Sequence, residues 1–143
     1  MLNTTTRRYR DFMTACRREA QAWNGDHTPT VNDIIRRVIS GGAPRFYTSY
    51  DTAIRRVCHY LSGKNTPPDS LKGRMWRDIT ERVAVRREAD PTLSISQAVI
   101  NVLDEDEAPS FYLSFFSARS TYFRVRALRR LSGEHRIGRR RLL

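Results

Sequence analysis

The residues of this chain that are best suited to chemistry are its arginines. Of 26 basic residues 24 are arginine, and the formal net charge at pH 7 is +11. A guanidinium binds phosphate through two parallel hydrogen bonds and stacks on bases, whereas a lysine ammonium is a hydrated point charge. The composition therefore favours nucleic acid as the ligand. A genome that favours arginine codons, with the arginines on solvated helix faces, is the alternative explanation.

Two groups of residues are predicted to contact nucleic acid. The first lies on the outward face of a helix that contains residue 45 and continues to about residue 61, where arginine can read guanine edges or hold phosphates and hydroxyls can do either. The second lies in the last helix and the basic segment that follows it. The predicted contact residues are Arg45, Ser49, Thr52, Arg55, Arg56, Arg124, Arg126, Arg129, Arg130, Arg136, Arg139, Arg140 and Arg141.

The sequence has no residue pattern that is typical of catalysis or metal binding. It contains no glycine-rich phosphate loop, no nucleophile elbow and no histidine spaced to activate a serine or cysteine. Cys16 and Cys58 lack the paired spacing of a zinc site, and the acidic run at residues 104–107 lacks the alternating spacing of a calcium loop. We therefore expect a protein that is not an enzyme and that needs no metal or other cofactor.

The acidic run from Asp104 to Glu107 interrupts the basic composition. Four consecutive carboxylates repel phosphate, so this segment is not expected to face nucleic acid. It could receive an arginine-rich face of a second copy or of a partner protein, or it could be an ordinary solvated loop.

A seven-residue motif occurs twice in the chain. Residues 43–49 and residues 108–114 share Ala-Pro-x-Phe-Tyr-x-Ser at an offset of 65 residues. Such an internal repeat indicates two copies of one supersecondary unit. Units of about 60 residues bury too little surface to be stable alone, so the two halves are expected to pack against each other.

Apolar residues at helical spacing predict three helices in each half. The first helices are expected over residues 9–22 and 71–87. The second helices begin at Thr30 and Ser94, each followed three residues later by a side chain that can complete a capping box. The third helices contain the two copies of the motif.

The motif itself allows two local structures. With Pro44 in the first helical turn, Phe46 and the apolar residues after it fall on one face of a helix. Alternatively, residues 45–48 are extended and the helix begins at a Ser49 cap. We expect the motif phenylalanines in the core and the tyrosine hydroxyls bonded to backbone groups. A platform that stacks single-stranded bases is the other interpretation.

The fold class predicted from these patterns is all-α, with two tandem three-helix repeats that resemble helix-turn-helix units. Residues 1–63 form the first repeat, 64–70 a linker, 71–133 the second repeat and 134–143 a mobile basic tail. No apolar run reaches the roughly 18 residues of a bilayer span and the N-terminus lacks a secretion signal, so we expect no membrane contact and a cytoplasmic location.

The sequence thus predicts a protein that binds nucleic acid without catalysis, most directly double-stranded DNA, as a regulator or packaging accessory. The third helix of the first repeat and the basic C-terminal segment would make the contacts. The alternative is a structural or adaptor protein, such as a phage-particle component or a ribosome-associated factor, whose arginines meet acidic protein or RNA.

Overall fold

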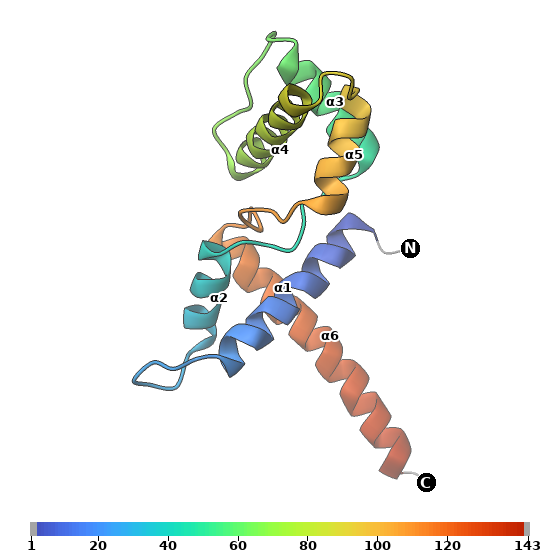
Figure 1. Cartoon of the computed structure of the whole chain (residues 1–143). Helices are drawn as coiled ribbons and strands as arrows, with labels where there is room; N and C mark the ends of the chain where they lie inside the picture. Colours follow the sequence, from blue (N-terminus) through green and yellow to red (C-terminus); the bar gives the residue numbers. More distant parts are fainter. Residues whose placement is uncertain (1–2, 142–143) are drawn as a thin grey trace.

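The computed structural model of the chain describes residues 3–141, without the side chains of residue 129 and residues 132–141. The described residues form six α-helices and no strand, so the all-α class is confirmed. In chain order the helices are α1 (Thr4–Gln21), α2 (Val31–Ser40), α3 (Tyr50–Leu61), α4 (Leu71–Ala89), α5 (Ile95–Glu105) and α6 (Phe115–Arg141) (Figure 1).

A polar side chain caps the first turn of each of these helices. Each accepts a hydrogen bond from the N–H group three residues later, a donor that the helix leaves unpaired. The predicted capping box of Thr30 and Asp33 is complete. Ser94 also caps its helix, but the Gln97 side chain bonds to Asn101, so the second box is half formed. The capping residues are Asn3, Thr30, Ser49, Ser70, Ser94 and Ser114.

The third helix of each half begins at the serine of the motif and not at its proline. Ser49 Oγ accepts the N–H of Thr52 at 3.2 Å, and Ser114 Oγ accepts the N–H of Ser117 at 3.1 Å. The prediction of a helix that contains Pro44 is wrong, and the alternative of a non-helical segment before a Ser49 cap is confirmed. The physical reason is that this segment must carry the chain across the molecule before the next helix can start.

The two halves of the chain exchange their third helices when they pack. α1 and α2 pack on α6, whereas α3 packs on α4 and α5. In Figure 1 the α3/α4/α5 unit lies at the top and the α1/α2/α6 unit lies below it. The third helix of each half thus joins the first two helices of the other half. Tandem repeats in which each half packs on itself are not confirmed.

The two motif copies meet where the chain crosses between the units. Ala43 and Ala108 form an isolated antiparallel bridge, in which the N–H of each donates to the carbonyl oxygen of the other at 2.9 and 3.0 Å. A Cβ atom on Gly42 would lie 3.0 Å from the carbonyl oxygen of Ala108, so the two segments approach too closely for most side chains at this point. The reciprocal bonds relate the two copies by approximate two-fold symmetry.

Four aromatic rings of the motif copies fill the crossing. The ring of Phe46 stacks on Tyr112 with centroids 6.4 Å apart, and Tyr47 stacks on Phe111 with centroids 6.0 Å apart. Phe111 is 1% exposed and also meets the ring of Phe12 on α1 edge-on at 5.8 Å. The prediction that Phe46 and Phe111 lie in the core is confirmed, and rings buried in this way cannot stack on bases.

The tyrosine hydroxyls of the motif bond to carboxylates and not to backbone groups as expected. The hydroxyl of Tyr47 donates to Asp11 Oδ2 at 2.7 Å. The hydroxyl of Tyr112 donates to Asp78 in the same way. Burial, followed by the hydrogen bond to the aspartate, raises the pKa of both tyrosines far above the ordinary value.

The exchanged packing can be tested by cross-linking cysteines introduced at Asn32 and Arg119, whose side chains meet at 3.3 Å between α2 and α6. With Cys58 replaced by serine, a short bismaleimide should join positions 32 and 119, as read by mass spectrometry of the peptides. The matched pair places cysteines at Asn32 and Arg55. Arg55 is next to Ile54, the α3 residue that aligns with Arg119, so this pair would be close if each half packed on itself. Cross-linking of that second pair in place of the first would contradict the exchange.

The tyrosine contacts predict how stability depends on alkaline pH. Because the folded-state pKa values are raised, the stabilisation is fully present below the unfolded-state pKa of about 10 and is lost as the pH rises beyond it. Replacing Tyr47 and Tyr112 with phenylalanine should lower the unfolding free energy by about 1–3 kcal/mol per site at pH 8. Urea unfolding at pH 8 and pH 10.5 should also show a weaker pH dependence for the double variant than for the wild type. Equal pH dependence in the two proteins would contradict this assignment.

Candidate nucleic-acid interface

The exchange of third helices divides the charge of the chain unequally. Residues 3–40 and 115–141, which contain α1, α2 and α6, include 16 basic and five acidic residues. Residues 50–105, which contain α3, α4 and α5, include nine basic and eight acidic residues. The α1/α2/α6 unit therefore carries a net charge of +11, equal to that of the whole chain, and the α3/α4/α5 unit is close to neutral.

The outer face of α1 carries a row of arginines. Arg7, Arg10, Arg17 and Arg18 are exposed and occupy one side of the helix at 3.6 residues per turn. The opposite side contains Phe12, which is fully buried. Sequence reasoning placed no contact residue in this helix, although the spacing of its arginines opposite an apolar stripe was a usable signal.

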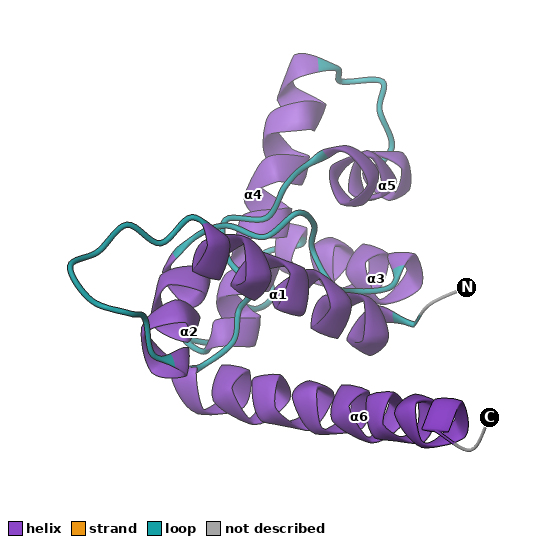
Figure 2. Ribbon diagram, turned by 90° about the horizontal axis from the view of Figure 1, so that it is seen from below, coloured by secondary structure: helices purple, strands orange, loops and turns teal. Residues whose placement is uncertain are grey.

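Two arginines of α6 contact polar side chains of α1 and α2. α6 crosses α1 in Figure 1 and lies in the layer next to it in Figure 2, and the two helices are in contact. Arg124 Nη1 lies 3.5 Å from the hydroxyl oxygen of Tyr9 on α1, and Arg119 Nε lies 3.3 Å from Asn32 Oδ1 on α2. Arginines of α6 thus take part in its packing against both α1 and α2. The exposed arginines of α6 are Arg119, Arg124, Arg126 and Arg130.

The first group of predicted contact residues is dispersed by the structure. Arg45 lies in the crossing segment, with Nε 3.0 Å from Asp11 Oδ2, so the prediction that it projects outward from the third helix is wrong. Ser49 and Thr52 form the α3 cap, and their hydroxyl groups are 2.8 Å apart. Arg55 and Arg56 are exposed on α3, in the unit that is close to neutral. This helix packs on α4 and α5 and not on α1 or α6.

The second group lies on α6. Arg124, Arg126 and Arg130 are exposed, in agreement with their predicted contact role. The helix continues to Arg141, so the segment predicted as a tail after residue 133 extends the same helix. The remaining predicted side chains, which lie outside the described residues, are those of Arg129, Arg136, Arg139, Arg140 and Arg141.

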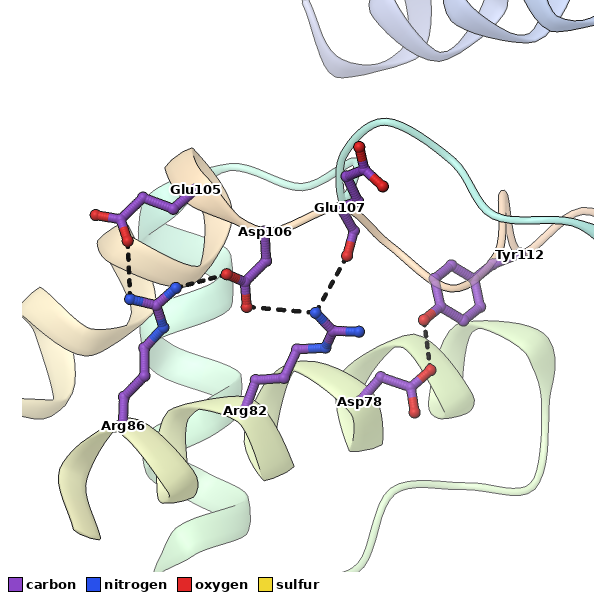
Figure 3. A network of polar contacts seen from close by, with 7 residues as sticks. All are labelled: Asp78, Arg82, Arg86, Glu105, Asp106, Glu107 and Tyr112. Atoms are coloured by element: carbon purple, nitrogen blue, oxygen red, sulfur yellow. Dashed lines mark hydrogen bonds and ion pairs between the residues drawn. The ribbon is translucent and has the colours of Figure 1, made fainter. Parts of the chain in front are cut away.

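The acidic run at the end of α5 is paired within the chain (Figure 3). Arg86 binds Glu105 at 2.9 Å and also binds Asp106. Arg82 binds Asp106 at 3.3 Å and donates to the carbonyl oxygen of Glu107 at 3.1 Å. The two arginines of α4 thus neutralise much of the charge on which an intermolecular contact through residues 104–107 would depend.

Comparisons of the chain with protein-family models, curated proteins and solved structures give no match. Among the residues that the structure describes, no three histidine, cysteine, aspartate or glutamate side chains gather as metal ligands would. Between residues 3 and 141, none of the helices combines the length and the apolar character that crossing a bilayer requires.

Proposed function

We propose that this protein binds nucleic acid without catalysing a reaction, and that its α1/α2/α6 unit contacts the phosphates of duplex DNA. The observation that carries the proposal is the concentration of the entire net charge of +11 in that unit. Duplex DNA carries one negative charge per about 1.7 Å of its axis, and arginines that neutralise phosphates release the condensed counterions.

The lack of ion pairs at the exposed arginines of α1 and α6 supports this proposal. The ion pairs found among the described side chains include none from the exposed arginines of α1 or α6. Arginines without a carboxylate partner retain their full charge for an external anion. Arg10 and Arg17 of α1 and Arg126 of α6 are exposed arginines without such a partner.

The shape of α6 favours phosphate contact over base reading. With 27 residues this helix is about 40 Å long, which exceeds one turn of B-DNA. Its arginines point to more than one side, and such contacts position a protein on DNA without specifying sequence. A packaging or regulatory accessory that covers DNA fits this arrangement.

A structural or adaptor role remains the second candidate, and the apolar residues of α6 favour it. Phe116 is 82% exposed, Leu128 61% and Leu131 64%. Exposed apolar side chains among arginines suit an acidic protein partner with an apolar centre better than they suit a phosphate backbone.

Duplex binding and its salt dependence test the first candidate. About five phosphate contacts give a log–log slope of affinity against salt of roughly −4 to −5. Replacing Arg10, Arg17, Arg124 and Arg126 with glutamine should flatten the slope by about three units, as measured by fluorescence anisotropy with a 20-base-pair duplex.

The matched control replaces Arg55, Arg56, Arg74 and Arg77 with glutamine, which removes the same charge from exposed positions of the α3/α4/α5 unit. It should leave the slope within about one unit of the wild-type value. Equal flattening by both variants would refute the localisation to α1 and α6. No binding of the wild type to duplex DNA or RNA at about 50 mM salt would refute the function and leave the adaptor role.

A further inference from the structure

A cleft opens between α1 and the first turns of α6. Its volume is about 460 Å³, and its polar lining includes Arg8 of α1 and Arg124 of α6. A neighbouring cleft of about 260 Å³ shares Arg8 and Tyr112 and adds Lys72 of α4. The described residues that line the two clefts include three basic side chains and no carboxylate.

The guanidinium of Arg8 has no anionic partner among the described side chains. Its side chain is half-buried, and its Nε atom is shielded from solvent without a hydrogen-bond partner. Asp11, one turn further along α1, is held by the hydroxyl of Tyr47 and by Arg45. A partly buried guanidinium without a counter-ion is unfavourable, and an anion that enters the cleft removes this cost.

The α6 side of the cleft offers hydroxyl groups. Ser114, Ser117 and Ser120 recur every three residues and line the cleft. The positive end of the α6 dipole lies at the same place and adds to the field of the two arginines. Leu71 of α4 and Phe116 of α6 add an apolar part to the lining.

The internal duplication allows two cleft residues, Arg8 and Phe116, to be compared with their counterparts in the other half. When the two Arg-Asp dipeptides of α1 and α4 are aligned, Met75 stands in the place of Arg8. When the two motifs are aligned, Asp51 of α3 stands in the place of Phe116. The motif residues of the crossing, which include Tyr112 and Ser114 of the cleft, are shared by both halves, whereas Arg8 and Phe116 are not. Packing of the common fold therefore does not require arginine at position 8 or phenylalanine at position 116.

The backbone departs from the two-fold symmetry at the same place. Tyr112, which lines both clefts, has a φ of 54°, and among the described residues it is the one non-glycine with a positive φ. This left-handed conformation costs about 1–3 kcal/mol for a bulky residue and is typical of functional sites.

We propose that the cleft binds a phosphate monoester, with Arg8 and Arg124 as the cationic contacts and the hydroxyl groups of Ser117 and Ser120 as donors. The group attached to the phosphate would lie against the apolar part of the lining. A terminal phosphate of a nucleic acid and a free mononucleotide present this same group. The site goes beyond the proposed duplex contact, because the exposed arginines of α1 would meet polymer phosphates on the helix surface, whereas the cleft is a recess that would hold one phosphate group.

Inorganic phosphate is the first probe. At equal ionic strength, about 50 mM phosphate should raise the melting temperature of the wild type by about 3–6 °C relative to chloride if the dissociation constant is about 5 mM. Arg8→Met, which introduces the residue found in the other half, should abolish this rise. Arg124→Gln, at an exposed position where the fold is not at risk, should at least halve it. Arg56→Gln on α3 is the control and should retain it.

The source of the phosphate is distinguished by titration with adenosine monophosphate and with single-stranded oligonucleotides that carry either a 5′-phosphate or a 5′-hydroxyl. Binding at least fivefold tighter to the phosphorylated strand assigns a nucleic-acid end. Equal binding of the two strands together with binding of the mononucleotide assigns a free nucleotide. The same rise in melting temperature for the wild type, Arg8→Met and Arg124→Gln, or no rise for the wild type, overturns the site. Duplex affinity is measured on the same proteins. If the wild type binds duplex DNA but shows no phosphate effect, the cleft site fails and the proposed function does not.

Discussion

The reciprocal backbone bridge between Ala43 and Ala108 is the contact on which the rest of the structure depends. Both alanines are almost fully buried, and their small side chains let the two segments pass at hydrogen-bonding distance. The aromatic rings then stack in reciprocal pairs across this point, which fixes the direction in which each segment leaves the crossing. A larger side chain at either alanine would push the segments apart and separate the rings that α3 and α6 follow.

The distribution of charge follows from this crossing. If each half packed on itself, the arginines of α6 would lie against α4 and α5, whose unit contains eight carboxylates. The exchange instead places α6 on α1 and α2, so that like charges accumulate on three adjacent helices. Such an accumulation destabilises the free protein by self-repulsion, and a bound polyanion relieves that repulsion. The fold therefore links the stability of one unit to the presence of a ligand.

Local features of the structure could be predicted from the sequence, and contacts between distant segments could not. The capping box of Thr30 and the duplication of the motif depend on residues close in the chain, and both identify real elements. Helical periodicity shows which face of α6 is apolar but not which helices cover it, since α3 starts from the same motif and could pack in the same place. The pairing of Arg45 with Asp11 joins residues 34 positions apart and left no local signal, which is why Arg45 was predicted to face solvent.

The order of the helices along the chain also sets the order in which the two units can be completed during synthesis. By the time residue 105 has left the ribosome, α3, α4 and α5 are all present, and their unit can close. α1 and α2 are made before these three helices, but their apolar faces are covered only when α6 has followed. The basic surface is thus assembled only after α6 has been made, and a nascent chain that has reached α5 does not yet present it in its finished form.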